Sequence, residues 1–187
     1  MASISSFSKQ RKGHLAILMY PSLKTRTYEE LEINSIKYAN YLNSLDLQYG
    51  SHIAIYAQNC IEFLEICWAA QRSGIIYTCI PYHLTKKEAE YIIVNCGAEF
   101  VAYTHKTSKI IDKIKRNKKH SDINFFQLEN SMESISNNFS VKKNFDEIEG
   151  SDMLYSSGTT GKPKGIKLKF SKQVFGKPPY LVELMKK

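Results

Sequence analysis

A stretch rich in glycine, hydroxyl and lysine side chains, YSSGTTGKPKG at residues 155–165, is the part of the sequence best suited to chemistry. Glycine has no side chain and tolerates positive φ angles, so its backbone N–H groups can approach a ligand closely. The serines and threonines add short hydrogen-bond donors, and Lys162 and Lys164 add positive charge. Backbone amides in such a loop form a concavity that binds anions. The stretch therefore predicts a cradle for an anion, above all a polyphosphate.

The two common nucleotide-binding motifs do not match this stretch. A Walker loop needs G-x-x-x-x-G-K-S/T between a strand and a helix. Here Gly158 and Gly161 are too close together, and Pro163 follows Lys162. A dinucleotide-binding G-x-G-x-x-G pattern fails as well. The flanking segments, SDMLY before the loop and residues 166–170 after it, have strand-like patterns, so the loop is expected to join two strands.

Strands and helices are predicted to alternate upstream of the loop. Capping boxes at Thr27 with Glu30 and at Thr85 with Glu88 indicate two helix starts. Gly74 indicates where the intervening helix ends. Strands are expected at residues 52–57, 75–81, 99–104 and 123–128. This alternation is typical of βαβ units, so we expect an α/β fold with a parallel sheet over about residues 50–128. The residues expected in its core are Ile53, Ile55, Phe63, Ile66, Trp68, Ile76, Ile80, Val101 and Phe125.

The chain is expected to have three parts. Residues 1–128 are predicted to form a βαβ-type N-terminal subdomain. Residues 129–150, rich in asparagine, serine and acidic residues, are predicted to be a connecting loop. Residues 151–187 are predicted to form a phosphate-loop hairpin and a truncated basic tail.

The net charge of +8 comes from two basic segments. Residues 162–187 carry eight lysines against Glu183, and residues 106–120 carry six lysines and Arg116 against Asp112. The remainder of the chain is net acidic, which is not typical of a protein that coats nucleic acid. Aromatic residues are not interleaved with the charges of residues 106–120, as stacking on bases would require. A solvated helix face is expected there, and no nucleic-acid partner is predicted.

The cysteines and histidines show no metal-ligand spacing, so no metal site is predicted. Buried, reduced thiols are expected at the four cysteines, Cys60, Cys67, Cys79 and Cys96. No apolar run approaches the about 18 residues that a membrane-spanning helix needs. No transmembrane segment is therefore predicted, and a cytoplasmic location is expected.

The motif at Tyr155–Gly165 resembles the phosphate loop of the adenylate-forming superfamily. This superfamily contains acyl-CoA synthetases, aryl-CoA ligases, luciferases and the adenylation domains of peptide synthetases. Two upstream segments are also similar to it: residues 25–42 to its early helix, and residues 53–93 to its first strand–helix–strand–helix block. The resemblance extends over about residues 15–170.

The resemblance implies a two-step ligase that uses ATP, Mg²⁺ and coenzyme A. A carboxylic acid, acyl or aryl, attacks the α-phosphate of ATP to give an acyl-adenylate, and a thiol then displaces AMP. By position in the motif, five residues are expected to contact the β- and γ-phosphates: Ser156, Ser157, Thr159, Thr160 and Lys164. Three glycines, Gly158, Gly161 and Gly165, are expected to allow close backbone approach, and Lys162 to act as an outer charge.

Later parts of the family pattern are not found in the 187 residues. These are the motifs that bind adenine and ribose and the small C-terminal domain with the catalytic lysine. We therefore expect the N-terminal part of the large domain of an acyl-CoA synthetase, inactive alone, and assign no catalytic residue. Two alternatives remain: a non-catalytic remnant that binds nucleotide or associates with a partner through exposed sheet edges, and, more distantly, a basic nucleic-acid-associated protein.

Overall fold

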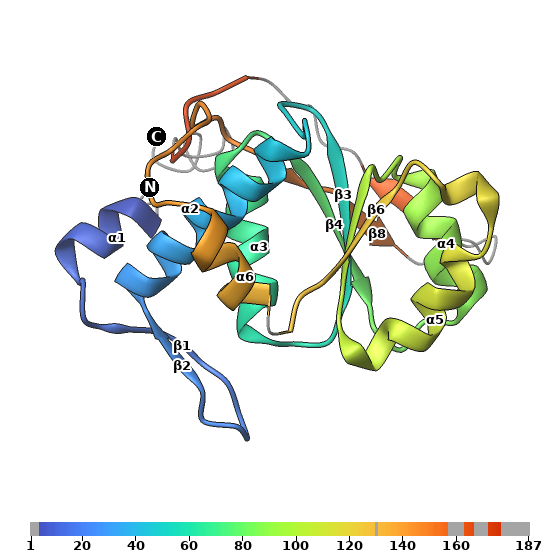
Figure 1. Ribbon diagram of the computed structural model, residues 1–187, viewed down its shortest axis with the longest axis horizontal. Coiled ribbons are helices and arrows are strands. Elements are labelled where there is room, and N and C mark those ends of the chain that lie inside the picture. The colour runs from blue at the N-terminus through green and yellow to red at the C-terminus, as the bar shows by residue number, and fades with distance from the viewer. Residues whose placement is uncertain (1–3, 130, 157–162, 167–171, 177–187) are drawn as a thin grey trace.

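The computed structural model of the chain describes residues 4–129, 131–156, 163–166 and 172–176. A five-stranded parallel sheet with the order β6-β5-β3-β4-β7 forms its centre (Figure 1). The strands are β3 (His52–Ala57), β4 (Ile76–Pro81), β5 (Phe100–Tyr103), β6 (Asn124–Gln127) and β7 (Ser151–Asp152). The predicted parallel α/β block is confirmed, and β7 extends it by one short strand.

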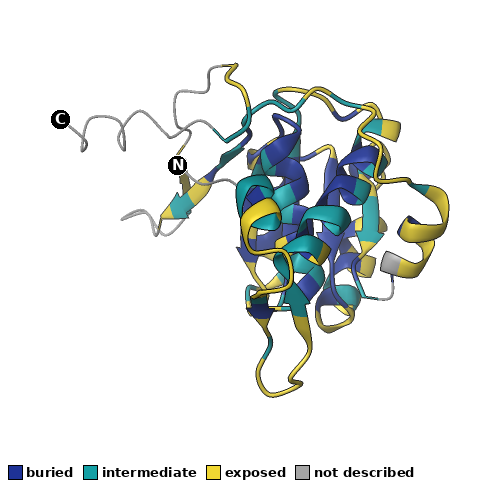
Figure 2. Cartoon of the chain, turned by 90° about the vertical axis from the view of Figure 1, so that its left-hand side faces the viewer, coloured by how far each residue is buried: buried dark blue, intermediate teal, exposed yellow. Residues whose placement is uncertain are grey.

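Helices cover both faces of this sheet (Figure 1). The helices are α1 (Ile4–Gln10), α2 (Tyr28–Ser44), α3 (Ile61–Arg72), α4 (Lys86–Asn95), α5 (His105–Lys115) and α6 (Ser131–Asn138), with a short 3-10 turn, η1 (Lys118–His120). Buried side chains of α2, α3 and α6 pack with Ile53 and Ile55 of β3. Those of α4 and α5 pack with Ala54 and Tyr56, which point to the opposite face of the same strand. Figure 2 shows these buried residues gathered between the layers.

Local signals set the helix ends as predicted. The Thr27 N–H donates to the Glu30 carboxylate over 2.7 Å at the start of α2, and the Thr85 N–H donates to Glu88 over 2.8 Å at the start of α4. Gly74 follows the end of α3 with a φ of +68°, a conformation that glycine adopts at little cost. Both capping boxes and this stop are confirmed.

Six of the nine predicted core residues are buried. The other three, Phe63, Trp68 and Phe125, are half-buried. Phe125 lies on β6, the edge strand of the sheet, and Trp68 packs its ring edge-on against Phe175 at 6.4 Å between centroids. An aromatic side chain on an edge strand is covered on one side only, which explains the partial exposure of Phe125.

The prediction of a connecting loop at residues 129–150 is wrong in part, because α6 lies within it. The hydroxyl groups of Ser131 and Tyr38 lie 2.7 Å apart and join α6 to α2. Downstream of α6, the buried side chain of Asn40 donates to the carbonyl groups of Ser140 and Lys142 and accepts the N–H of Asn144. These bonds satisfy backbone groups that would otherwise lack partners, so the segment is ordered against α2.

Two antiparallel hairpins complete the described fold. β1 (Leu15–Leu18) pairs with β2 (Thr25–Thr27), and β8 (Leu154–Ser156) pairs with β9 (Lys164–Ile166). The first hairpin projects beyond α2 (Figure 1) and exposes 87% of Tyr20 at its tip. Within the described ranges, no helix combines the length and apolar character needed to cross a membrane.

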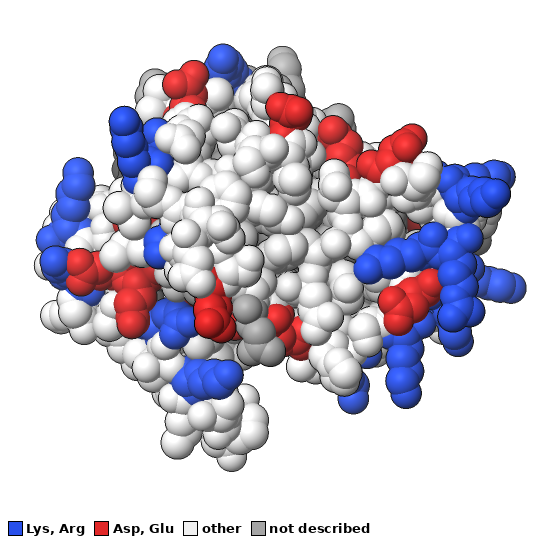
Figure 3. Space-filling view, viewed as in Figure 1, with Lys and Arg blue, Asp and Glu red and all other residues white. Residues whose placement is uncertain are grey.

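The predicted basic helix face is confirmed. Lys and Arg side chains gather at the end of the molecule formed by α4 and α5 (Figure 3). In the basic segment of residues 106–120, the exposed basic residues are Lys106, Lys109, Lys113, Lys115, Arg116, Lys118 and Lys119. The apolar face of α5 is turned the other way, with Ile111 and Ile114 buried against the sheet.

Candidate phosphate-loop site

Strands lie on both sides of the glycine-rich stretch, as predicted, but their bounds differ: residues 151–155 are divided between β7 and β8, and β9 begins at Lys164 rather than at residue 166. Ser156 ends β8, Lys164 begins β9, and these two residues stand directly opposite each other in the antiparallel register. Both side chains are exposed. A hydroxyl group and an ammonium group therefore flank the mouth of the glycine-rich loop, one on each strand, which suits the donor requirements of a phosphate.

Only three of the nine predicted phosphate-site residues, Ser156, Lys164 and Gly165, belong to the described part of the chain. The other six, Ser157, Gly158, Thr159, Thr160, Gly161 and Lys162, lie outside the described residues. The same holds for residues 167–170 of the predicted second strand and for most of the predicted basic tail. The phosphate-contact roles of the nine residues stay predictions.

The hairpin is attached to the parallel sheet through its first strand. β7 pairs with β4, and the Met153 N–H then donates to the Tyr77 carbonyl group over 2.9 Å. One residue into β8, the Tyr155 hydroxyl group donates to Asn95 Oδ1 at the end of α4 over 2.6 Å. Burial raises the pKa of Tyr155 to about 12, so this phenol stays protonated as a donor at neutral pH. No sequence signal connected Asn95 with the loop, because the two residues are far apart in the chain.

Gly165 is opposite Tyr155 in the hairpin, and its lack of a side chain serves packing. A Cβ atom at residue 165 would overlap the Met153 methyl group and lie 3.1 Å from Tyr155 Cζ. The Met153 side chain can move, whereas the Tyr155 ring is held by its bond to Asn95. Glycine at this position therefore lets β9 lie close to β8 over the tyrosine ring.

Gly150 fixes the point where the chain enters β7. A Cβ atom here would lie 2.6 Å from the carbonyl oxygens of both Ala70 and Ile75. The Gly150 N–H donates to the Gln71 carbonyl group over 2.6 Å, and Gln71 Nε2 returns a bond of 3.1 Å to the Gly150 carbonyl group. The end of α3 thus sets the position of β7, and with it the base of the phosphate-loop hairpin.

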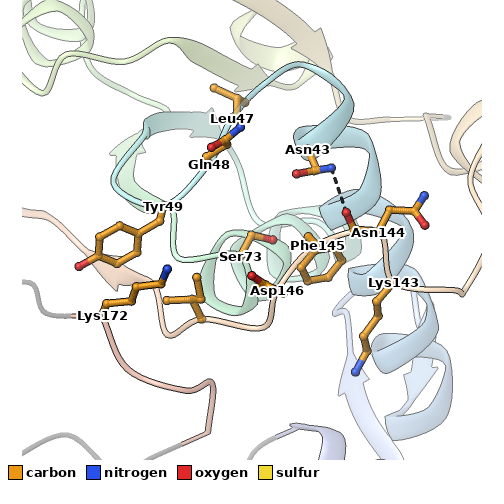
Figure 4. A pocket seen from close by; sticks show the side chains of 11 residues that line it. Asn43, Leu47, Gln48, Tyr49, Ser73, Lys143, Asn144, Phe145, Asp146 and Lys172 are labelled. Carbon is orange, nitrogen blue, oxygen red and sulfur yellow. Dashed lines mark hydrogen bonds between the residues drawn. The ribbon is translucent and has the colours of Figure 1, made fainter.

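An open cavity of about 490 Å³ lies elsewhere, between the end of α2 and the segment before β7 (Figure 4). It is lined by Asn43, Leu47, Gln48, Tyr49, Ser73, Lys143, Asn144, Phe145, Asp146, Ile148 and Lys172. Asn43 donates to the Asn144 carbonyl group across one side over 3.2 Å, and Lys143 pairs with Glu147 at 2.6 Å. The three described phosphate-site residues, Ser156, Lys164 and Gly165, do not contribute to this lining.

The cysteines are all free, but the expectation that they are buried is wrong for three of them. Cys96 is buried, Cys60 and Cys67 are half-buried, and Cys79 is exposed. β7 pairs with β4 only at Ile76 and Tyr77, so this side of β4 is open at Cys79 among the described residues. In the described ranges, no three histidine, cysteine or acidic residues are grouped so as to hold a metal ion.

Comparison with protein families and with characterised proteins gives a consistent result. The family model of the AMP-binding enzymes matches residues 6–175. A 2-succinylbenzoate–CoA ligase from Oceanobacillus iheyensis is 30% identical over 147 residues, which are 77% of this chain and 28% of the relative. The long-chain-fatty-acid–CoA ligase FadD13 of Mycobacterium tuberculosis is 25% identical over 174 residues, which are 89% of this chain and 35% of the relative. The chain thus spans about a third or less of the length of these relatives.

Solved structures show the same fold. The inhibitor-bound N-terminal domain of FACL13 from Mycobacterium tuberculosis aligns with a TM-score of 0.74 at 21% identity, covering 89% of this chain and 44% of that domain. The anthranilate CoA ligase AuaEII in complex with anthranoyl-AMP aligns with a TM-score of 0.76 at 20% identity, covering 87% of this chain and 32% of that protein. The described α/β architecture is therefore that of the N-terminal region of such ligases.

Proposed function

We propose that the chain, which belongs to the AMP-binding enzyme family, supplies the phosphate loop and the preceding α/β block of an ATP-dependent acid–thiol ligase. In this reaction a carboxylate attacks the α-phosphate of ATP and releases pyrophosphate, and the thiol of coenzyme A then displaces AMP from the acyl-adenylate. The relatives are named for acids as different as 2-succinylbenzoate and long-chain fatty acids, so the proposal extends to a carboxylic acid, acyl or aryl.

The observation that carries this proposal is the antiparallel pairing of β8 with β9, held to α4 by the Tyr155–Asn95 bond, at the two ends of the glycine-rich loop. Ser156 and Lys164 offer a donor and a cation at its mouth, and both are exposed to a ligand. Fixed donors and cations offset the negative charge that develops on departing pyrophosphate. Mg²⁺ bound to the phosphates would add Lewis-acid stabilisation of the same charge. Side chains and amides of the loop would hold the β- and γ-phosphates.

The 187 residues are expected not to complete this reaction by themselves. Two or three charge-assisted contacts to the phosphates contribute about 3–9 kcal/mol to the binding free energy, before the entropy cost of ordering the loop is subtracted. Ordering a glycine-rich loop costs about 1–2 kcal/mol for each residue fixed. The net binding free energy that remains is at most about that of a complex with a millimolar dissociation constant, roughly −4.1 kcal/mol. Weak ATP binding without acyl-AMP formation is the expected behaviour.

A cytoplasmic location is part of the proposal, since the free cysteines suit a reducing compartment.

A chimeric enzyme tests the proposal. Residues 6–175 would replace the matching segment of an active relative such as FadD13, and carboxylate-dependent exchange of pyrophosphate into ATP would be measured. We expect exchange by the chimera and none by the isolated chain with a panel of fatty and aromatic acids. A chimera that unfolds cooperatively yet shows no exchange would count against the proposal, whereas exchange by the isolated chain would refute only its inactivity.

A second candidate function is association with a partner protein. The cross-strand pair Leu154 and Ile166 is 58% and 49% exposed, and Val174 is 62% exposed. Exposed apolar side chains next to a short edge strand favour association. Sedimentation of the purified chain at micromolar concentration tests this, and we expect self-association or binding to the remaining part of a relative. A chain that stays monomeric and does not bind that remaining part would argue against a partner-binding role.

A further inference from the structure

Two cysteines from different elements face each other at the exposed side of β4. The Sγ atoms of Cys67 on α3 and Cys79 on β4 lie 4.0 Å apart. Cys79 is exposed, whereas Cys67 is half-buried beside it. The packing of α3 against β4 brings the two residues together, although neither spacing nor local sequence marks them as a pair. An oxidant in solution can therefore reach the Cys79 thiol, and the Cys67 thiol lies within contact distance of it.

The surroundings make these two thiols chemically unequal. With Cys67 as the hydrogen-bond donor, the contact between the sulfurs lowers the pKa of Cys79 and raises that of Cys67. Burial raises the pKa of Cys60 to about 12 and also raises the pKa of Cys96. The thiolate is the reactive form of cysteine. Cys79 is thus both the most exposed and the most readily ionised of the four.

We propose that Cys67 and Cys79 are a redox modification site, at which peroxide converts the thiol pair into a reversible disulfide. The Cys79 thiolate attacks one peroxide oxygen, the O–O bond breaks, and hydroxide leaves to give a sulfenic acid on Cys79. The Cys67 sulfur then loses its proton and attacks the Cys79 sulfur. The S–S bond forms, the S–O bond breaks, and the departing oxygen leaves as water. Two thiols are oxidised, and one peroxide is reduced to two waters.

The distance of 4.0 Å between the two sulfur atoms is short enough for a small side-chain movement to bring them together. A disulfide requires an S–S distance of about 2.05 Å, so the sulfurs must approach by about 2 Å from contact. The bond would join α3 directly to β4, two elements already packed together, without bringing distant parts of the chain into contact. A thiol reductant would restore the pair, because thiol–disulfide exchange proceeds through the accessible sulfur. The proposal does not depend on the proposed ligase function.

Peptide mapping of the oxidised chain tests the proposal. The folded 187-residue protein would be treated with hydrogen peroxide at neutral pH, free thiols would be blocked, and the protein would be cleaved after arginine, lysine and glutamate. Cleavage at Arg72 and at Glu62 or Glu65 places Cys60, Cys67 and Cys79 on three separate peptides. We expect a Cys67–Cys79 link and a fall in titratable thiols from four to two, restored by a thiol reductant.

Matched variants separate this pair from general oxidation. Cys60→Ser and Cys96→Ser should keep the link, whereas Cys79→Ser should lose it, and Cys67→Ser should leave a sulfenic acid on Cys79 that dimedone traps. In urea the preference for this pair should disappear, because it depends on the fold. A predominant Cys60–Cys67 link, or oxidation of Cys79 to sulfinic acid in the folded wild-type chain without any link, would overturn the proposal.

Discussion

The guanidinium group of Arg72, at the end of α3, lies 2.6 Å from the Glu32 carboxylate of α2 and has no exposed side-chain surface. The same Nη2 atom is 3.0 Å from Ser5 Oγ of α1 and 3.6 Å from Glu147, in the segment that leads to β7. One buried cation thus joins three helices to the segment that enters the sheet beside the phosphate-loop hairpin. Removing one member of a buried ion pair leaves the opposite charge without a partner in the protein interior, which destabilises the fold.

Replacing Arg72 by methionine should therefore lower the free energy of unfolding by about 3–5 kcal/mol, as measured by urea denaturation. The matched control is Lys12→Met, since Lys12 lies 2.7 Å from Glu29 but the two side chains are 68% and 40% exposed. An exposed pair contributes at most about 1 kcal/mol. Equal losses in the two variants would show that burial does not decide the contribution of the Arg72 pair.

Gly150→Ala should destabilise the chain because the new Cβ would meet two backbone carbonyl oxygens at 2.6 Å. Backbone atoms cannot move aside as a flexible side chain can, so we expect a loss of about 1–3 kcal/mol. Gly13→Ala is the control, since a Cβ there meets no atom within 4 Å. Thermal unfolding of both variants gives the measurement, and an unchanged midpoint for Gly150→Ala would contradict the expected clash.

The stability contributed by Glu90 should depend on pH. A hydrogen bond from His120 at 2.9 Å is the main reason that the pKa of Glu90 lies below its usual value. An ion pair with Lys86 at 3.0 Å lowers this pKa further, by a smaller amount. A carboxylate with a depressed pKa stabilises the folded state above its unfolded pKa of about 4.3, and this contribution is lost as the pH falls through the folded value.

Glu90→Gln should thus be less stable than wild type at pH 7, by at most about 1 kcal/mol, and the difference should shrink as the pH falls below about 4. The control is Glu133→Gln, at an exposed position of α6. Urea denaturation across the pH range gives both curves. A difference that stays constant down to pH about 3 would mean that the ionised form of Glu90 is not what stabilises the fold.

Local sequence signals were sufficient for the parts of the fold that depend on neighbours in the chain. Thr27 with Glu30 and Thr85 with Glu88 are three residues apart, so each capping box could be recognised directly. The alternation of strands and helices likewise predicted the parallel block, because a crossover helix is the short way to join parallel strands. The loop was expected between two strands, and the described ends of β8 and β9 agree with this.

Features that depend on distant residues could not be predicted in this way. α6 has the sequence SMESISNN, whose serines and asparagines are weak helix formers, and it is stabilised by Ile135 in the core and by the Ser131–Tyr38 bond. The exposure of Cys79 depends on where β7 ends, which no residue near Cys79 indicates. The burial of Glu65 could not be predicted for the same reason, because the side chains that donate to its carboxylate, Arg26 and Asn34, are 39 and 31 residues away in the sequence.

The bond from Tyr155 to Asn95 should position the phosphate-loop hairpin. Tyr155→Phe removes the hydroxyl group that donates over 2.6 Å and leaves the ring in place. A neutral hydrogen bond contributes about 0.5–1.5 kcal/mol, so the loss of stability should be of that size. In the chimeric ligase, pyrophosphate exchange should also slow, with Tyr28→Phe as a control on α2. Wild-type exchange in a variant with reduced stability would show that the bond only stabilises the fold.

The strongest test of the phosphate loop is the replacement of Thr160 or Lys164 by alanine in the same chimera. Both residues are predicted to contact the departing phosphates, and Lys164 lies on β9 opposite Ser156. A charge-assisted contact contributes about 1.5–3 kcal/mol, which corresponds to a slowing of adenylate formation by roughly tenfold or more. Lys172→Ala is the matched control, because Lys172 lines the separate cavity and its ammonium group lies 5.9 Å from the centre of the Tyr49 ring. Single-turnover formation of acyl-AMP gives the rates. If Thr160→Ala and Lys164→Ala form the adenylate as fast as the unmodified chimera, neither residue contacts the phosphates in the transition state.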